Sequence, residues 1–151
     1  MKAGELCKRD VVTVNKDDTI VEAARRMREA HVGDVVVVHQ SDPRIPIGIL
    51  TDRDIVVGVI ARDVDHFAML EVGDVLSRDR LVTAREGEDV RQVLSRMKTH
   101  GVRRVPVVDE AGHLVGILTF DDLVEHLSGM LSDLSRLLSR GLADEQLRRA
   151  S

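Results

Sequence analysis

Aromatic residues are nearly absent from this chain of 151 residues, which has two phenylalanines and neither tyrosine nor tryptophan. Proteins that bind single-stranded nucleic acid commonly stack bases on aromatic side chains, so this mode of binding is not expected. A surplus of positive charge is missing as well, because 22 lysines and arginines face 26 acidic residues. We therefore expect no nucleic-acid partner, and any purine bound here must lie between aliphatic side chains.

Cysteine and long apolar runs are also scarce. The single cysteine, Cys7, cannot form an intramolecular disulfide, which is typical of a reducing compartment. The first residues lack the apolar segment of a signal peptide, and the longest apolar runs, 35–38 and 55–61, are too short to cross a membrane. We expect a cytoplasmic protein with no membrane partner.

One seven-residue stretch occurs twice. Residues 48–54 read GILTDRD and residues 116–122 read GILTFDD, with five identical positions. In each copy an apolar strand ends at a threonine, and an aspartate follows three residues later, which places both in one turn if a helix begins there. Free backbone amides at a helix start, a hydroxyl and a carboxylate could together hold a ribose phosphate. Alternatively, the aspartates simply cap their helices and the threonines are strand ends.

The duplication extends beyond this motif. Residues 12–38 and 82–108 align with an offset of 70 and share eight identical positions, where roughly two are expected by chance. The two motif copies are only 68 residues apart, so the first repeat has two extra residues, which fall in the turn-rich stretch 39–46. The sequence predicts an α/β fold of two βαββα units that pack with pseudo-two-fold symmetry.

Apolar spacing and turn residues predict the elements of each repeat. Strands are expected at 11–14, 35–38 and 45–50, and again at 81–84, 105–108 and 114–118. The first helix of each repeat is expected to begin at Asp17 or Asp18 and at Glu88 or Asp89, and the closing helices near residues 53 and 121. Pro106 has no N–H group, so its strand is expected to be an edge strand or the rim of a ligand cleft.

A family resemblance rests on the second repeat. Its residues 102–109 (VRRVPVVD), Gly112, residues 114–119 (LVGILT) and Asp122 resemble a cystathionine-β-synthase-type (CBS) domain. The first repeat is similar, and together they resemble a tandem CBS pair, or Bateman module. We divide the chain into CBS repeat 1 (1–66), CBS repeat 2 (67–128) and a C-terminal helical extension (129–151).

The resemblance implies a regulatory module rather than an enzyme. It implies that an adenosyl ligand, such as AMP, ADP, ATP or S-adenosylmethionine, binds in clefts between the repeats, with no cofactor required. Signalling to a partner would follow from a change of shape or of dimer geometry. Two other interpretations remain: a structural or protein-interaction module with degenerate ligand sites, and a regulatory subunit of an enzyme encoded elsewhere.

The resemblance also implies roles for particular residues. The aspartates of the motif would hold ribose hydroxyls and its threonines would contact phosphate, and the adenine would lie against the short first strand of the other repeat. The backbone of the proline-containing strand would lie next to the ligand. The implied binding residues are Thr51 and Asp54 with Thr83 and Ala84, Thr119 and Asp122 with Thr13 and Val14, and Val105 with Pro106.

The two repeats differ in charge before the central strand. Arg103 and Arg104 occupy positions where the first repeat has Gly33 and Asp34. A cation about 4 Å from a phosphate contributes roughly 4 kcal/mol at an effective dielectric constant near 20, before desolvation, whereas a carboxylate repels the phosphate. The hypothesis is that phosphate binds in the cleft that these arginines reach, which favours the second motif copy. Alternatively, the arginines form a solvated charged edge.

Metal and catalytic motifs are not found. The six histidines and Cys7 show no metal-ligand spacing, and the sequence has neither a nucleophile elbow nor a phosphate-binding P-loop. We predict no metal site and no catalytic residue.

The C-terminal stretch has more leucine than a closing helix needs. Its apolar stripe consists of Leu123, Leu127, Met130, Leu131, Leu134, Leu137 and Leu138. Gly141 is expected to end or break this helix. We expect a homodimer with the helix at or near the interface, although it could instead pack along its own domain. An unidentified effector protein is a further expected partner.

Overall fold

The strands form two three-stranded sheets with the same topology. The computed structural model describes residues 1–62 and 65–150. In each sheet the first strand runs parallel to the central strand and the third runs antiparallel to it. The strands are β1 (Thr13–Asn15), β2 (Asp34–Val38) and β3 (Pro46–Thr51), then β4 (Ala84–Arg85), β5 (Arg104–Val108) and β6 (Leu114–Thr119). The predicted α/β fold of two βαββα repeats is confirmed.

The helices fall at equivalent places in the two repeats. In the first repeat they are α1 (Ala3–Leu6), α2 (Ile20–Ala30) and α3 (Asp52–Gly58), followed by the 3₁₀ turns Ile60–Arg62 and Phe67–Met69. In the second repeat they are α4 (Val72–Val75), α5 (Val90–His100) and α6 (Phe120–Ala150). The buried face of α2 carries Ile20, Ala23 and Met27, and that of α5 carries Val90, Val93 and Met97, as the apolar spacing predicted.

The predicted start of α5 is correct and that of α2 is wrong. The Asp89 carboxylate accepts a hydrogen bond from the Arg91 N–H at 2.8 Å and caps α5. Helix α2 is capped instead by Thr19, whose hydroxyl accepts from the Glu22 N–H at 3.2 Å. Asp18 is not available for capping, because its carboxylate accepts from the Asn15 N–H at 2.8 Å in the preceding turn.

Pro106 lies in a central strand, so the predicted edge position is wrong. Strand β5 lies between β4 and β6, and Pro106 is opposite Ile117 of β6. In the first repeat the equivalent residue, Val36, donates its N–H to the Val12 carbonyl at 2.9 Å. Because proline cannot donate this bond, β4 pairs with β5 only from Ala84 onward and is shorter than β1.

Each repeat packs its first short helix on the other repeat. Ala3 of α1 is buried in the core of the second repeat, where its N–H donates to the Glu88 carbonyl at 2.9 Å. Val72 of α4 is buried in the core of the first repeat, where its N–H donates to the Asp18 carbonyl at 2.8 Å. The domain boundary at residue 66 therefore divides the sequence repeats and not the packed cores, and it stays a prediction.

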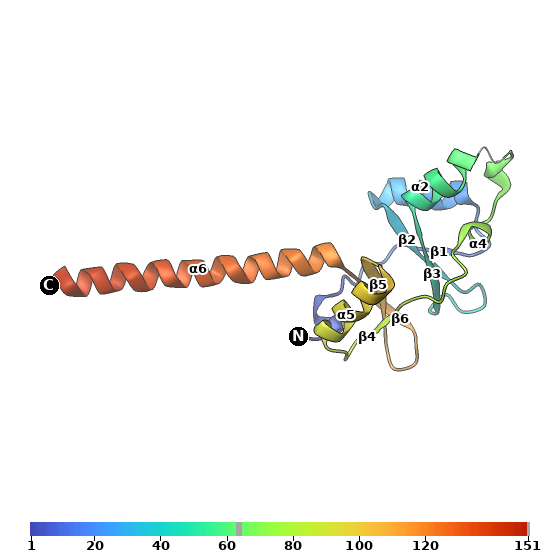
Figure 1. The fold of residues 1–151 in the computed structure, drawn as a ribbon. Helices are drawn as coiled ribbons and strands as arrows, with labels where there is room; N and C mark the ends of the chain where they lie inside the picture. The colour runs from blue at the N-terminus through green and yellow to red at the C-terminus, as the bar shows by residue number, and fades with distance from the viewer. Residues whose placement is uncertain (63–64, 151) are drawn as a thin grey trace.

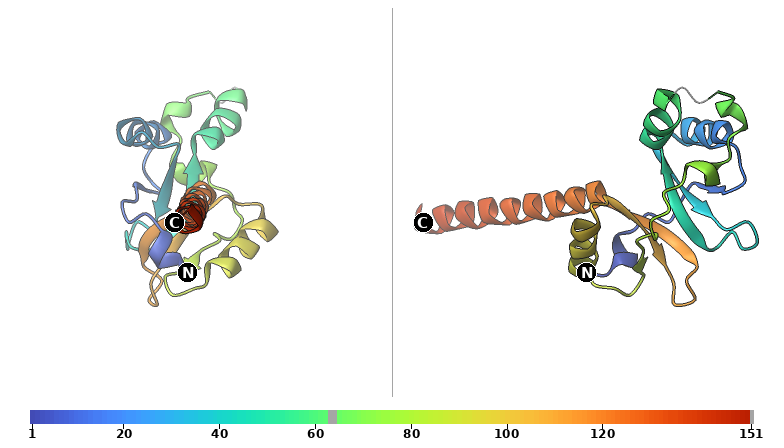
Figure 2. Two further views of the ribbon diagram at one scale, coloured as in Figure 1. Left: turned by 90° about the vertical axis from the view of Figure 1, so that its left-hand side faces the viewer. Right: turned by 45° about the vertical axis from the view of Figure 1, so that its right-hand side comes forward.

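The repeats also share an apolar cluster at their interface. Val36 and Val38 from β2 pack with Ile117 from β6. Near the hairpins, the Leu114 N–H donates to the Arg44 carbonyl at 2.6 Å. These contacts place the two sheets side by side with the hairpins together, as the two views in Figure 2 show.

Helix α6 extends far beyond the two repeats. It runs without a break from Phe120 to Ala150, so the predicted end or break at Gly141 is wrong. Glycine in a helix costs about 1 kcal/mol relative to alanine, which a long helix with strong helix formers on both sides can tolerate. Leu123 is its one buried residue, and the rest of the helix projects into solvent (Figures 1 and 2). The alternative that the stripe packs along its own domain is therefore wrong.

Candidate functional site

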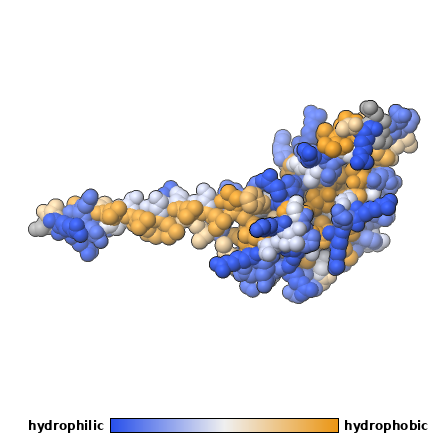
Figure 3. All heavy atoms as spheres, in the orientation of Figure 1, coloured by the Kyte–Doolittle hydropathy of each residue, from blue (hydrophilic) through white to orange (hydrophobic). Residues whose placement is uncertain are grey.

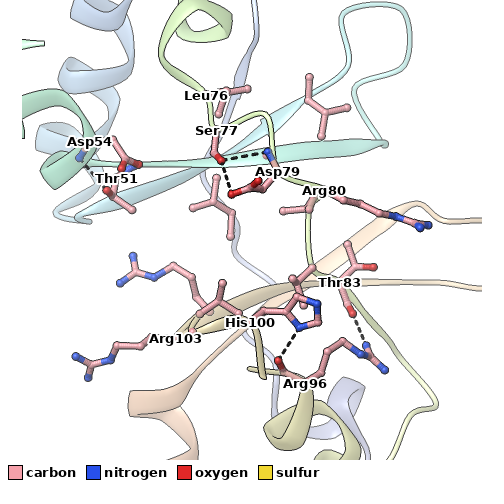
Figure 4. Close-up of a pocket in the computed structure, with 18 residues that line it drawn as sticks. Thr51, Asp54, Leu76, Ser77, Asp79, Arg80, Thr83, Arg96, His100 and Arg103 are labelled. Carbon is pink, nitrogen blue, oxygen red and sulfur yellow. Dashed lines mark hydrogen bonds between the residues drawn. The ribbon is translucent and has the colours of Figure 1, made fainter. Parts of the chain in front are cut away.

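A cavity of about 970 Å³ lies between the repeats. One wall is formed by β3 and the start of α3, including Thr51 and Asp54, and the opposite wall by the C-terminal part of α5 and residues 101–104. The segment that crosses from one repeat to the other, residues 76–83, closes the side. Figure 4 shows Thr51 and Asp54 on one side, with Thr83, Arg96 and His100 across from them.

Thr51 and Asp54 cap helix α3 with each other. The Thr51 hydroxyl accepts from the Asp54 N–H at 3.0 Å, and Asp54 Oδ2 accepts from the Thr51 N–H at 2.9 Å. The capping alternative considered from the sequence is thus present in the structure. It leaves Asp54 Oδ1 without a hydrogen bond or ion pair from any described residue, so this oxygen can accept from a ligand.

Thr83 is held in the opposite wall by an arginine that sequence reasoning missed. Arg96 donates to the Thr83 carbonyl at 2.5 Å and also pairs with Glu88. In the first repeat, Arg26 donates to the Thr13 carbonyl at 2.6 Å. Both arginines fix the short first strand to the first helix of their repeat. The sequence contained a signal for this role, because Arg26 and Arg96 are identical residues at equivalent positions of the two repeats.

Arg103 and Arg104 both line the cavity, and both have acidic partners. Arg103 donates to Asp121 at 2.9 Å and its guanidinium lies 5.4 Å from the centre of the Phe120 ring. Arg104 pairs with Asp34 of the other repeat. The sequence assigned these arginines to the second motif copy, but they line the cavity that contains Asp54 of the first copy, and this assignment is therefore corrected.

Other polar residues of the cavity were not predicted. Arg80 makes no hydrogen bond or ion pair with any residue in the described part of the chain, and His100 Nδ1 donates to the Arg96 carbonyl of its own helix at 3.0 Å. Four arginines face only two carboxylates, Asp54 and Asp79, on the cavity lining. Three of these arginines are also paired with carboxylates outside the lining, so Arg80 is the lining arginine that has no acidic partner among the described residues.

The second motif copy is engaged by the N-terminal segment. The Asp122 carboxylate lies 2.6 Å from Lys8 Nζ, and it also accepts from the Thr119 hydroxyl at 2.6 Å. Burial raises the pKa of Asp122, but the hydrogen bonds from Lys8 and Thr119 and the Lys8 charge outweigh it, and the pKa is below its ordinary value. Neither Thr119 nor Asp122 lines the 970 Å³ cavity, and Thr13 does not line it either.

Several predicted site residues can offer only their backbone to a ligand. Val14, Ala84 and Val105 have side chains that are at most 1% exposed and belong to the cores of the two repeats. Pro106 is also buried. None of these four residues lines the cavity.

A model of the CBS domain family matches residues 3–60 and again residues 72–129. The chain belongs to the CBS domain family. The resemblance drawn from its second repeat is thereby confirmed for both repeats.

Relatives of this CBS pair include small proteins and larger enzymes. Hypoxic response protein 1 of Mycobacterium tuberculosis is 35% identical over 127 residues, which are 84% of this chain and 81% of that protein. MK0525, an uncharacterised protein of Methanopyrus kandleri, is 36% identical over 83% of this chain. Inosine-5'-monophosphate dehydrogenase of Methanocaldococcus jannaschii is 32% identical over 82% of this chain. The CBS pair spans 62% of the length of MK0525 and 23% of that of the dehydrogenase.

Two solved CBS structures resemble the fold. The CBS domain protein PAE2072 from Pyrobaculum aerophilum, complexed with AMP, superposes with a TM-score of 0.73 and 28% identity, covering 82% of this chain and 90% of that one. Hypoxic Response Protein I with two coordinated zinc ions has a TM-score of 0.72 and 31% identity, covering 83% of this chain and 98% of that one. Within residues 1–62 and 65–150 of the present CBS pair, no three histidine, cysteine, aspartate or glutamate side chains form a group suited to a metal ion. No helix of the same residues has the length and apolar character of a membrane span.

Proposed function

We propose that this CBS pair binds an adenosyl nucleotide in the cavity between its repeats and acts as a regulatory sensor. The observation that supports this most strongly is the placement of Thr51 and Asp54 across a cavity from Val82 and Thr83, which are 28 or more residues away in the sequence. The AMP complex of PAE2072, a relative with 28% identity, supports the adenosyl class of ligand.

The residues of the cavity suit the three parts of such a ligand. Asp54 Oδ1 accepts from ribose hydroxyls while Oδ2 keeps its place in the helix cap. The adenine lies between aliphatic side chains such as Ile49 and Val82, because the described residues that line the cavity include no phenylalanine, tyrosine or tryptophan. The phosphates lie near Thr51 and Arg80, the lining arginine that has no acidic partner among the described residues.

The first motif copy is the preferred site, which reverses the ranking from the sequence. Asp122 of the second copy already pairs with Lys8, so a ribose there must displace a charge-assisted hydrogen bond. Asp54 makes no ion pair with any described residue. The carboxylate that a ligand can reach without competition is therefore the one beside the cavity.

Ligand occupancy is signalled through the contact between the repeats. Arg104 lines the cavity and pairs with Asp34 across the repeats, so a phosphate that approaches Arg104 competes with Asp34. This competition alters the ion pair between the repeats. The resulting change of shape is transmitted to a homodimer partner or to an effector protein. No catalytic role is proposed for any residue.

The test is a thermal-shift and calorimetry panel of AMP, ADP, ATP, GTP and S-adenosylmethionine with Asp54→Asn. Asparagine keeps an oxygen for the helix cap but removes the negative charge. A hydrogen bond to a charged group contributes about 1.5–3 kcal/mol, so we expect adenosyl affinity to fall roughly ten- to hundredfold. The control is Asp17→Asn, which lies in the turn before α2 and outside the cavity lining, and it should bind like the wild type.

A second function is favoured by a different observation, the long exposed helix α6. In this second function, the CBS pair is a protein-interaction module with degenerate ligand sites. Failure of all five ligands to stabilise the wild-type protein, or equal affinity of wild type and Asp54→Asn, would favour this second function.

A further inference from the structure

The part of α6 after Leu123 is a long helix whose side chains do not enter the described cores of the two repeats. Every residue from Val124 to Ala150 is exposed, and Leu123 is the last side chain that enters a core. This part is roughly 40 Å long at 1.5 Å per residue. Isolated helices in water are marginally stable, and most helical stability in proteins comes from the packing of an apolar face. The helix therefore needs a partner along its length.

One face of this helix carries a stripe of large apolar side chains. Its members are Leu127, Met130, Leu131, Leu134, Leu137 and Leu138, each between 47% and 70% exposed. Their spacing repeats after seven residues, as at positions a, d and e of a heptad. In Figure 3 apolar side chains form a band along the α6 shaft. An apolar band of this extent indicates a protein interface.

The charge of α6 is divided between its two halves. The half from Phe120 to Ser135 has four carboxylates, Asp121, Asp122, Glu125 and Asp133, and no lysine or arginine. The half from Arg136 to Ala150 has four arginines against two carboxylates. A second copy of the same helix complements both halves only if it runs in the opposite direction.

We propose that two copies of the chain pair through this stripe as an antiparallel helix pair. The two-fold axis passes between Ser135 and Arg136. In this register Leu134 packs against the partner's Leu137, and Met130 against the partner's Gly141, in the a-to-d layers of an antiparallel coiled coil. The proposal rests on the homodimer of the proposed function and does not depend on nucleotide binding.

Flanking residues fit the same register. Asp133 lies beside the partner's Arg140, and the symmetry forms this ion pair twice. Among the described residues of its own chain, Asp133 pairs with Arg136 alone, in an exposed contact at 4.0 Å that contributes little. Leu131 lies beside the partner's Leu138 and widens the apolar contact. The basic last turn, with Arg148 and Arg149, reaches the acidic first turn of the partner's helix.

A parallel pair fits the sequence less well. It would place Arg140 near the partner's Glu145, which is favourable. However, Asp144 would face the partner's Asp144 in a core layer, and Arg148 would face the partner's Arg148. The acidic halves would also lie together, which costs free energy where like charges are close.

The first measurement is mass by light scattering over a range of concentrations, with full-length variants. Leu134→Lys should raise the dimer dissociation constant at least about tenfold, because it removes a central apolar contact. Ser132→Lys, which adds the same charge on the outer face of the helix, should leave it unchanged. Asp133→Arg and Arg140→Asp should each weaken the dimer, and the double variant should restore it. These side chains lie on the exposed part of α6, so thermal unfolding of the body of the molecule serves as the folding control.

The second measurement gives the orientation. A spin label at Gln146→Cys, in a Cys7→Ala background, should be separated from its partner by about 30 Å along the axis in the antiparallel pair, against roughly 10–20 Å in a parallel one. A monomeric wild type, an assembly larger than a dimer, a short label distance, or no restoration in the charge-swapped variant would each overturn the proposal. The nucleotide affinity of the same variants is measured separately. It shows whether the proposed sensor function is retained when the helix pair is lost.

Discussion

Gly48 and Gly116 are the same residue of the duplicated motif, but their neighbours differ. A Cβ at Gly116 would lie 2.5 Å from Cys7 Sγ and 2.8 Å from the Lys8 carbonyl oxygen. A Cβ at Gly48 would meet only the tip of Leu76, at 2.9 Å. Both glycines allow the segment from the other half of the chain to cross closely over the third strand of the sheet. Close packing thus explains why glycine occupies this position in both repeats, and the space for a Cβ is smaller in the second repeat.

We predict that Gly116→Ala destabilises the protein more than Gly48→Ala does. In the first case a backbone oxygen must move, at a cost of about 1–3 kcal/mol or more, whereas the Leu76 side chain can rotate away. Gly87→Ala is the control, because a Cβ there meets nothing within 4 Å. Urea unfolding of the three variants measures the difference. Equal stabilities for Gly116→Ala and Gly87→Ala would contradict the close crossing at β6.

At the scale of elements, the two sheets differ through a single residue. Pro106 in β5 lacks the N–H that its counterpart Val36 donates to the Val12 carbonyl. The Val82 carbonyl, equivalent to that of Val12, therefore has no matching donor in β5. Val82 lines the cavity, so this difference between the repeats lies beside the proposed ligand site.

We predict that Pro106→Val lengthens β4 without a large change in stability. The new hydrogen bond contributes about 0.5–1.5 kcal/mol, and the loss of proline costs about 0.4–1 kcal/mol by freeing the unfolded chain. Hydrogen exchange should show the amide of residue 106 as protected as that of Val36. Pro43→Val, in the hairpin turn, is the control. Its loss of stability should reflect only the greater freedom of the unfolded chain. A rapidly exchanging amide at residue 106 would show that the pairing of β4 is limited by something other than the proline.

At the scale of the whole molecule, positions 34 and 104 are related by the internal repeat and pair with each other. Arg104 belongs to the second repeat and Asp34 to the first, so their ion pair joins the two repeats. Burial raises the pKa of Asp34, Arg104 lowers it, and the nearby charge of Asp52 raises it, with a net increase above the ordinary value. The arginine therefore does not fully compensate for burial and the nearby Asp52 charge together, so the charged form of Asp34 remains disfavoured.

We predict that Asp34→Asn strengthens the binding of ligands with phosphate groups. The substitution frees Arg104 and removes a negative charge next to the cavity, which should tighten ATP binding by roughly fivefold if about 1 kcal/mol of charge interaction is gained. Adenosine, which has no phosphate, should bind with unchanged affinity. Calorimetry with both ligands gives the comparison. An equal gain for adenosine, or a loss for ATP, would show that Arg104 does not contact the phosphates.

The local elements and the family could be predicted from the sequence because they depend on short-range pattern. The spacing of Ile20, Ala23 and Met27 specifies a buried helix face, and the twin GILT motifs mark two strands that lead into helices. The duplication itself predicted two equivalent units. The start of α2 was missed since Thr19 and Asp18 are both good capping residues, and only the turn at Asn15 decides between them.

Only the tertiary structure decided which residues meet. The partner of Asp122 is Lys8, 114 residues away, and that of Arg104 is Asp34, so two motif copies with five identical positions have unequal surroundings. The exchange of α1 and α4 between the cores brings each N-terminal segment to the opposite repeat, where Lys8 pairs with Asp122, whereas Leu76 and Ser77 line the cavity with Asp54. The sequence by itself determined a CBS pair with two candidate sites and a leucine-rich helix. Long-range packing decided that Asp54 faces the cavity and that the leucine stripe remains exposed, since charge pairing and burial depend on neighbours that are distant along the chain.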